Sequence, residues 1–242
     1  MSKVFVDFAN ALCAELGKLN EKKLKLAEEF VSINGEGQKA GELALFLRFA
    51  GCDLACTYCD TAWANRKDTP YTLCSIKDLW HLAQERGIHN VTLTGGEPLL
   101  QPNIHYLPDL LLRDGFAVEI ETNGAQPIAP YLDICANRPD FTMDYKLPDS
   151  GMEDKMCLEN FELLTPTDTV KFVCGSLSDM ERAREIIGEY QLTEKTKVYF
   201  SPVFGKIDPK DMVGFMKEHQ MNAVRLQLQL HKFIWDPNEK GV

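Results

Sequence analysis

The chain has 242 residues and a formal net charge of −10. This length suits one domain around a single large core, and the charge excludes wide contact with nucleic-acid phosphates, which requires an excess of Lys and Arg. No apolar run reaches the ~20 residues of a membrane span. Asp7, Asn10 and Glu15 interrupt the apolar stretch that a secretory signal needs. We therefore expect a cytoplasmic protein whose eight cysteines are reduced thiols or metal ligands.

Residues 1–25 differ from the rest of the sequence. Phe5, Phe8, Leu12, Leu16 and Leu19 recur at helical spacing, which predicts an amphipathic helix. We expect this N-terminal helical extension to pack on the body of the protein, with a dimer contact as the alternative. Residues 26–242 are expected to form one domain, since no repeat, low-complexity tract or linker divides them.

Strand-like and helix-like segments alternate along the remaining chain. The expected strands are 43–49, 90–93, 117–121, 141–144, 169–174, 197–200 and 223–230, and the expected helices are 75–86, 104–113, 178–190 and 209–219. Ser75 with Asp78 predicts a capping box at the first helix, and Ser178 with Glu181 predicts another. This alternation is typical of an α/β fold with a parallel sheet, closed or partly closed.

Polar motifs follow five of the expected strands, at the points where the strands end. They are Thr94-Gly95-Gly96-Glu97-Pro98, Thr122-Asn123-Gly124, Lys146, Ser201-Pro202 and His231-Lys232. In barrels of parallel strands the active site is built at the C-terminal ends of the strands. We therefore expect the five segments to converge on one mouth.

Three cysteines follow the apolar segment 43–49 at C-x3-C-x2-C spacing: Cys52, Cys56 and Cys59. Iron–sulfur clusters are held by thiolates, usually four, and here the next cysteine is Cys74, beyond a Pro-containing stretch. The spacing predicts a [4Fe-4S] cluster with one iron open to a ligand that is not protein. The alternative is a structural zinc site, which needs a fourth ligand; His81 lies within an expected helix.

The cysteine loop resembles the signature of the radical S-adenosylmethionine (SAM) superfamily, and Gly95-Gly96-Glu97-Pro98 is similar to the motif that meets the methionine part of SAM. The resemblance implies a radical SAM core, an incomplete TIM-like βα barrel with a parallel sheet. It also implies that SAM chelates the open iron through its amino and carboxylate groups. Glycines would let the backbone approach this ligand.

Segments outside the cysteine loop resemble the 7-carboxy-7-deazaguanine synthase family, over essentially residues 26–242. The resemblance is carried by 30–37, Gly41, 46–52, 59–61, 121–124, 144–148, 150–151, 201–203 and 231–237. It implies a lyase of queuosine biosynthesis that converts 6-carboxy-5,6,7,8-tetrahydropterin to 7-carboxy-7-deazaguanine with loss of ammonia, and that requires Mg²⁺. A homodimer is implied, with a flavodoxin or ferredoxin as electron donor. The 5′-deoxyadenosyl radical would do the chemistry, so no protein side chain is expected to be catalytic.

The same resemblance assigns site residues by position. Cys52, Cys56 and Cys59 would hold the cluster and Thr61 would bind Mg²⁺. Cofactor-binding positions are Tyr58, Cys59, Asp60, Gly96, Glu97, Asp144, Tyr145, Lys146, Ser201, Pro202, Val203 and Phe204. Substrate-binding positions are Ile33, Asn34, Gly35, Arg48, Thr94, Glu121 and His231.

Some of these positions have structural alternatives. Arg48 matches a carboxylate with its bidentate fork, but it also suits an interstrand ion pair. Asn34 stands where the family often has Gln, so its arm is one methylene shorter. His231 suits substrate contact and a structural role equally, and the tail 235–242 would fold over the mouth. For the whole chain, the rival functions are a radical SAM activase of a protein partner and a non-catalytic zinc-binding module.

Overall fold

The computed structural model describes residues 17, 19–132, 138–236 and 239–242. The predicted N-terminal helix thus lies almost wholly outside the described residues, and the packing expected of it stays a prediction. Of its apolar positions, Leu19 is described, and it is buried in the main core.

In the described part of the chain, nine strands form one sheet in the order β3-β1-β2-β4-β5-β6-β7-β8-β9. Their bounds are β1 Lys23–Ile33, β2 Leu43–Phe49, β3 Thr72–Ser75, β4 Asn90–Gly95, β5 Ala117–Thr122, β6 Asp140–Tyr145, β7 Thr169–Cys174, β8 Lys197–Pro202 and β9 Val224–Leu226. The pairs from β2 through β9 are parallel. The pairs β1–β2 and β1–β3 are antiparallel.

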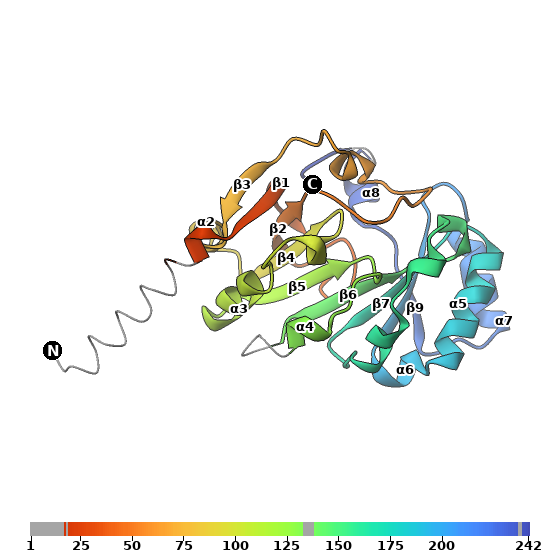
Figure 1. Cartoon of the computed structure of the whole chain (residues 1–242). Helices are drawn as coiled ribbons and strands as arrows, with labels where there is room; N and C mark the ends of the chain where they lie inside the picture. Colours follow the sequence, from red (N-terminus) through yellow and green to blue (C-terminus); the bar gives the residue numbers. More distant parts are fainter. Residues whose placement is uncertain (1–16, 18, 133–137, 237–238) are drawn as a thin grey trace.

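Helices connect and cover the parallel strands (Figure 1). Their bounds are α2 Ile76–Arg86, α3 Tyr106–Arg113, α4 Ala129–Leu132, α5 Leu177–Glu189, α6 Leu192–Lys195, α7 Pro209–Glu218 and α8 His231–Ile234. Short 3-10 turns are η1 Ala62–Asn65, η2 Pro98–Leu100, η3 Pro148–Ser150, η4 Glu153–Lys155 and η5 Leu158–Glu162. Figure 1 shows α2 and α3 near one end of the sheet and α5, α6 and α7 near the other.

The sheet is open, because β3 and β9 are its two edges, and the predicted incomplete βα barrel is confirmed. The gap in the barrel is bridged by side-chain and backbone contacts. Gly37 N donates to Gln227 Oε1 at 2.7 Å, and Gln227 Nε2 donates to Gly37 O at 3.0 Å. The sheet is therefore curved so that the loop after β1 meets the segment after β9.

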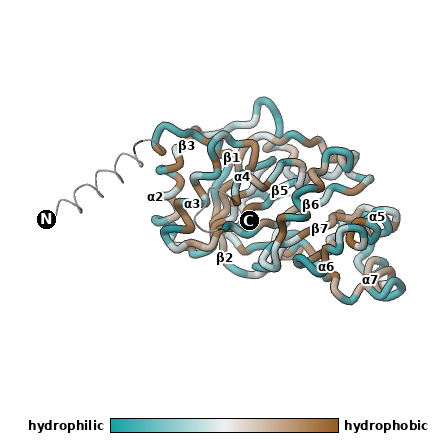
Figure 2. Tube along the Cα trace, turned by 60° about the horizontal axis from the view of Figure 1, so that its bottom comes forward, coloured by the Kyte–Doolittle hydropathy of each residue, from teal (hydrophilic) through white to brown (hydrophobic). Residues whose placement is uncertain are grey.

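The core lies between the strands and the helices. Figure 2 shows hydrophobic segments along the middle of the molecule and hydrophilic loops around its rim. The predicted capping box of α2 is confirmed, since Asp78 N donates to Ser75 Oγ and Ser75 N donates to Asp78. The box predicted at Ser178 is wrong: α5 begins at Leu177, and its cap is Ser176, whose hydroxyl accepts from Asp179 N.

Several expected boundaries are also corrected. β9 ends at Leu226, not at 230, because Gln227 turns its amide across the barrel gap to Gly37. α3 begins at Tyr106, two residues after its expected start. β1 begins at Lys23, so the sheet starts within the expected N-terminal extension. The antiparallel strands β1 and β3 were not predicted as strands.

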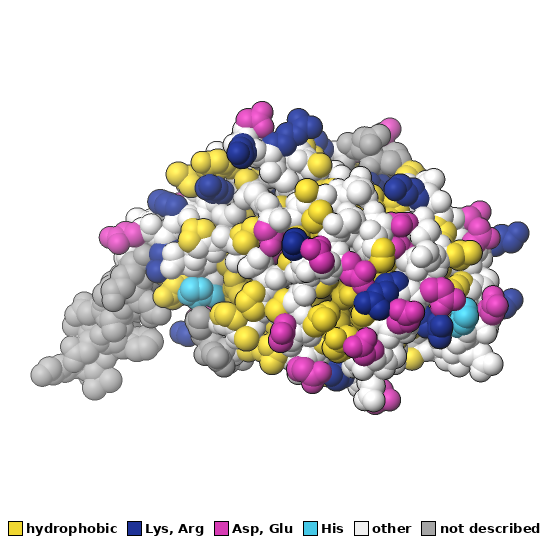
Figure 3. All heavy atoms as spheres, turned by 45° about the vertical axis from the view of Figure 1, so that its right-hand side comes forward, with side chains coloured by type: hydrophobic (Ala, Val, Ile, Leu, Met, Phe, Trp, Pro, Cys, Tyr) yellow, Lys and Arg dark blue, Asp and Glu magenta, His cyan; other side chains and the backbone are white. Residues whose placement is uncertain are grey.

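The surface view in Figure 3 shows acidic and basic side chains interspersed, with no continuous basic patch on the face drawn. Among the described residues, no helix is both long enough and apolar enough to cross a membrane.

Candidate active site

A cavity of about 810 Å³ lies at the C-terminal ends of the parallel strands. It is lined from the cysteine loop, from the ends of β2, β4, β5, β6 and β7, and from the chain's last described residues. Four of the five expected segments reach it with the predicted residues: Thr94, Thr122 with Asn123, Lys146, and His231 with Lys232. The convergence expected from the strand ends is therefore present.

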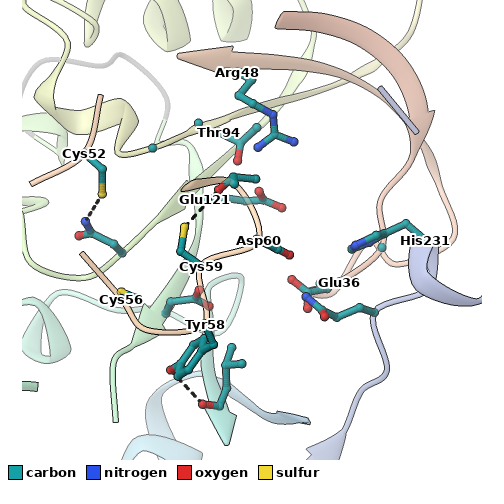
Figure 4. Close-up of a pocket in the computed structure, with 18 of the residues that line it drawn as sticks. Glu36, Arg48, Cys52, Cys56, Tyr58, Cys59, Asp60, Thr94, Glu121 and His231 are labelled. Carbon is teal, nitrogen blue, oxygen red and sulfur yellow. Dashed lines mark hydrogen bonds between the residues drawn. The ribbon is translucent and has the colours of Figure 1, made fainter. Parts of the chain in front are cut away.

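The three cysteines form one side of this cavity (Figure 4). Cys52 Sγ accepts from Asn123 Nδ2 at 3.5 Å and from Leu54 N at 3.5 Å. Cys59 Sγ accepts from Asn65 Nδ2 at 3.6 Å. Burial raises the pKa of the Cys52 and Cys56 thiols, so without a metal these thiols hold their protons at neutral pH. Binding iron would supply the charge that favours the thiolate.

The donor set suits a cluster better than a single ion. Within the described ranges, no three His, Cys, Asp or Glu side chains are placed to hold one metal ion. A cluster does not require them to meet at one point, because each thiolate binds a different iron. In addition, Asn65 Oδ1 is buried without a hydrogen-bond partner beside Cys59. Cys52, Cys56 and Cys59 would thus hold the cluster.

The two glycines after β4 allow the cysteine loop to pack closely. A Cβ on Gly96 would overlap the carbonyl oxygen of Gly51, and a Cβ on Gly95 would overlap that of Phe49. Gly96 N donates to Phe49 O at 3.0 Å, and Glu97 N donates to Gly51 O at 2.8 Å. The two glycines are predicted to let the backbone approach a ligand, and they also make room for the loop that carries the cysteines.

Glu97 does not line the cavity, and the cofactor contact expected of it stays a prediction. Its buried carboxylate accepts from Asn123 N at 2.6 Å, from Leu99 N at 2.9 Å and from Thr122 Oγ1 at 3.0 Å. Burial raises its pKa to about 7. Glu97 therefore fixes Asn123, whose side-chain amide donates to Cys52, and so affects the cysteine site without lining the cavity.

A buried charge network forms the floor between the cysteines and Glu36. Lys146 Nζ lies 2.8 Å from Asp144 Oδ2, and Lys171 Nζ lies 3.0 Å from Asp144 Oδ1. Lys171 Nζ also pairs with Glu36. Asp144 and Lys146 line the cavity as expected, whereas Tyr145 points to the other face of β6, where its hydroxyl donates to Glu153 Oε1 at 3.0 Å. Alternation along the strand explains why the Tyr145 side chain faces away, and its expected cofactor contact stays a prediction.

Of the four expected cofactor-binding residues 201–204, only the last two line the cavity. Val203 and Phe204 line it, but Ser201 and Pro202 do not. Ser201 is fully buried with its hydroxyl 3.5 Å from Glu36 Oε1, and Pro202 lines a separate cavity of about 450 Å³. The cofactor contacts expected at these two positions stay predictions.

The opposite side of the cavity carries the expected substrate residues. Those that line it are Ile33, Gly35, Arg48, Thr94, Glu121 and His231. Figure 4 shows Glu36 and His231 across the cavity from the three cysteines, with Arg48, Thr94 and Glu121 between the two groups. Burial raises the pKa of Glu121, and burial lowers the pKa of His231. A neutral His231 could donate one hydrogen bond and accept another.

Asn34 does not line the cavity, and the substrate contact expected of it stays a prediction. Its amide is buried within the sheet, where Nδ2 donates to Glu119 Oε2 at 3.2 Å and Oδ1 accepts from Thr92 Oγ1 at 3.1 Å. Both polar atoms of the shorter side chain thus have a partner inside the protein.

Arg48 shows both behaviours that its sequence position allowed. Its Nε lies 3.1 Å from Glu28 Oε2 in an interstrand ion pair, and the residue also lines the cavity. Thr61, Tyr58 and Asp60 line the cavity on the cysteine side. Thr61 Oγ1 is 3.7 Å from Cys59 Sγ.

The lining residues that sequence reasoning missed include Glu28, Asn65 and Lys171. The signal for Lys171 was available, since it is the charged residue within the strand Thr169–Cys174, all of whose residues are buried. Glu28 lies opposite Arg48 in the antiparallel pair β1–β2, which was not predicted. The described tail 239–242 lines the mouth, as expected.

Comparisons with known proteins agree with this geometry. Residues 47–142 match the sequence model of the Radical SAM superfamily. The crystal structure of QueE from Escherichia coli is similar in fold, with a TM-score of 0.68 at 24% identity, covering 86% of this chain and 94% of that chain. The fold and the cysteine site thus define a radical SAM enzyme, for which the superfamily implies a [4Fe-4S] cluster and SAM.

Curated relatives narrow the class to one family. The 7-carboxy-7-deazaguanine synthase of Clostridium acetobutylicum is 54% identical over 219 residues, covering 90% of this chain and 99% of the relative. The 7-carboxy-7-deazaguanine synthase of Chlorobaculum tepidum is 36% identical over 225 residues, covering 92% of this chain and 99% of the relative. The chain belongs to the 7-carboxy-7-deazaguanine synthase family, and the predicted resemblance is confirmed.

Proposed function

We propose that this enzyme converts 6-carboxy-5,6,7,8-tetrahydropterin to 7-carboxy-7-deazaguanine and releases ammonia, as a lyase of queuosine biosynthesis. One observation carries the proposal: a single cavity has three thiols on one side and carboxylate, guanidinium and imidazole groups on the other. When bound, the cluster and SAM supply a 5′-deoxyadenosyl radical that takes hydrogen from the substrate.

The protein's part is to orient the two ligands and exclude water. On the cofactor side, we propose that Tyr58, Asp60, Gly96, Asp144 and Lys146 contact SAM, because they line the cavity beside the cysteines. Tyr58 is held by its hydroxyl, which donates to Val173 O at 3.2 Å. Val203 and Phe204 would close the apolar side of the same region.

On the substrate side, Arg48 is proposed to bind the substrate carboxylate, with Glu28 holding the guanidinium in place at 3.1 Å. Glu121 and His231 offer acceptor and donor groups to the polar edge of the pterin. The backbone at Gly35 is held close to α8, since Leu230 N donates to Gly35 O at 3.4 Å. Ile33 and Thr94 complete this wall.

Thr61 is proposed to bind Mg²⁺. Thr61 lines the cavity on the cysteine side, with its hydroxyl 3.7 Å from Cys59 Sγ. Mg²⁺ takes few protein oxygens and keeps waters or substrate oxygens as its other ligands, so one hydroxyl with the substrate carboxylate is a sufficient start. A flavodoxin or ferredoxin as electron donor and a homodimeric assembly are proposed from the family alone.

The test incubates the anaerobically reconstituted, reduced protein with SAM, Mg²⁺ and the carboxytetrahydropterin, and measures the deazaguanine by mass. Product formation that falls when Mg²⁺ is chelated is the expected result. Release of 5′-deoxyadenosine with no deazaguanine would contradict the substrate and favour the activase. Tightly bound zinc in place of iron and sulfide would favour the zinc-binding module.

A further inference from the structure

Lys171 is a charged residue in the middle of a fully buried strand. All six residues of β7 are buried, and Lys171 lies in register with Asp144 on β6 and Tyr199 on β8. Its Nζ reaches the cavity floor and pairs with two carboxylates, Asp144 at 3.0 Å and Glu36. Asp144 lies on the neighbouring strand β6, whereas Glu36 comes from the loop after β1, 135 residues away in sequence.

The two carboxylates meet at Lys171, but their other neighbours lie on different sides of the cavity. Asp144 is also paired with Lys146, whose charge acts on the Cys56 thiol. Glu36 lies next to Gly35, where a Cβ would meet the ring of His231 at 3.1 Å. Figure 4 shows Glu36 on the His231 side, away from the cysteines. Lys171 is thus the shared cation between a carboxylate on the cofactor side and one on the substrate side.

Electrostatics keep this bridge charged. Burial by itself lowers the pKa of Lys171, but the charges of Asp144, Glu36 and Glu121 outweigh it and leave the pKa well above its usual value. A buried ion pair gives little net stability compared with apolar side chains of the same volume. A Lys in an otherwise apolar strand is therefore better explained by what it holds than by the stability it adds.

We propose that Lys171 is a positioning residue, which fixes the carboxylate of Glu36 against the substrate while tying it to the Asp144 carboxylate on the cofactor side. This inference rests on the proposed function and deepens it. Ser201 supports the same carboxylate, with its hydroxyl 3.5 Å from Glu36 Oε1. Without the ammonium group, Glu36 would lose its charged partner and the substrate its fixed orientation relative to the cofactor.

The test is a double-mutant cycle of Lys171→Met and Glu36→Gln, read as the ratio of 5′-deoxyadenosine released to deazaguanine formed. In Lys171→Met we expect this ratio to rise about tenfold or more, since small misplacements of reacting groups carry large rate penalties. If Lys171 acts through Glu36, the double variant should match Glu36→Gln within about twofold, because coupled residues are not additive.

Cluster absorbance and thermal unfolding are measured for every variant. Lys197→Met is the matched control, because Lys197 begins the neighbouring strand β8 but does not line the cavity. If Lys171→Met does not load its cluster, the double variant is used in its place. It removes both charges of the Lys171–Glu36 pair, and its product ratio is compared with that of Glu36→Gln alone.

Two results would overturn the role of Lys171. One is an unchanged product ratio in Lys171→Met beside an active wild type, and the other is losses that multiply in the double variant. A wild type that makes no deazaguanine would instead contradict the proposed function, so the two failures are distinguishable.

Discussion

Arg48 is held in place before any ligand arrives. Its ion pair with Glu28 at 3.1 Å joins two neighbouring strands and leaves the residue on the cavity wall. A fixed guanidinium loses less conformational freedom when it binds a carboxylate. The ion pair with Glu28 is therefore compatible with both roles: it joins two strands, and it also orients the guanidinium of Arg48 for a substrate carboxylate.

We predict that Arg48→Ala lowers product formation tenfold to about a hundredfold, the range for losing a hydrogen bond to a charged group. The cluster should remain, because Arg48 does not contact the cysteines. Product by mass and cluster absorbance check both parts. Arg113→Ala is the control, because this exposed guanidinium pairs with Asp109 and does not line the cavity, so the variant should retain activity. Loss of cluster absorbance in Arg48→Ala would contradict the role.

Glu119 makes stability depend on pH. Burial, together with the nearby Glu121, raises its pKa from 4.5 to about 7. The folded state therefore binds a proton more tightly than the unfolded state, and this contribution is complete below pH 4.5 and lost as pH rises through about 7. At about 1.4 kcal/mol per pKa unit, it is worth up to about 3 kcal/mol.

Glu119→Gln should remove this dependence, because Thr142 and Asn34 can exchange donor and acceptor roles with the amide. We expect the variant to gain stability relative to the wild type between pH 5 and pH 8, measured as the melting temperature of both proteins at each pH. Glu97 titrates in the same window but is present in both. A difference that is independent of pH would contradict the prediction.

At this scale the sequence predicted which segments meet but not which way each side chain points. Tyr145 and Glu97 belong to matching stretches, yet their side chains lie behind the cavity wall. Strand alternation could have excluded Tyr145 once Asp144 and Lys146 were assigned inward. The placing of Glu97 and Asn34 depends on partners distant in sequence, such as Asn123 and Glu119, which no local pattern shows.

At the scale of elements, the turn after β4 fixes how closely the cysteine loop can pack. Gly96→Ala would force its Cβ into the backbone of Gly51, and we expect a loss of about 1–3 kcal/mol with reduced cluster loading. Gly214→Ala is the matched control, because no atom lies within 4 Å of its Cβ position on exposed α7. It should gain about 0.5–1 kcal/mol. Thermal unfolding and iron content measure both, and equal behaviour would contradict the packing role.

Helices and parallel strands could be predicted because their signals are local: periodic apolar residues and caps. β1 was not predicted, because its burial pattern alternates only in part and its middle is half-buried. β3 has four residues and pairs with β1 alone. The N-cap of α5 was misplaced by two residues, because Ser176 and Ser178 are both residues that can cap a helix and the structure uses Ser176.

For the whole molecule, the parallel sheet and the open barrel were predictable from alternation and from the family resemblance. The closure of the gap was not, because it depends on Gln227 and Gly37, which are 190 residues apart. Gln227 was expected to lie within a strand. Its two hydrogen bonds to the Gly37 backbone instead complete the ring around the cavity.

Gln227→Ala should destabilise the protein by about 1–3 kcal/mol, because it leaves two backbone groups of Gly37 without their partner. The KM for the pterin should rise, since Gly35 and Glu36 lie on the same loop. Gln84→Ala is the control: this exposed helix residue bonds to Asp114 and should change stability by less than about 0.5 kcal/mol. Equal melting temperatures for the two variants would contradict the closure.

The ring also has a consequence for how the protein is made. Synthesis proceeds from the N-terminus, so the cysteine loop leaves the ribosome long before Gln227 exists to complete the ring. During that interval the thiols of Cys52, Cys56 and Cys59 are accessible to oxidants, and oxidation beyond the sulfenic acid is largely irreversible. The yield of cluster-loaded enzyme should therefore fall as the oxygen supplied during translation rises.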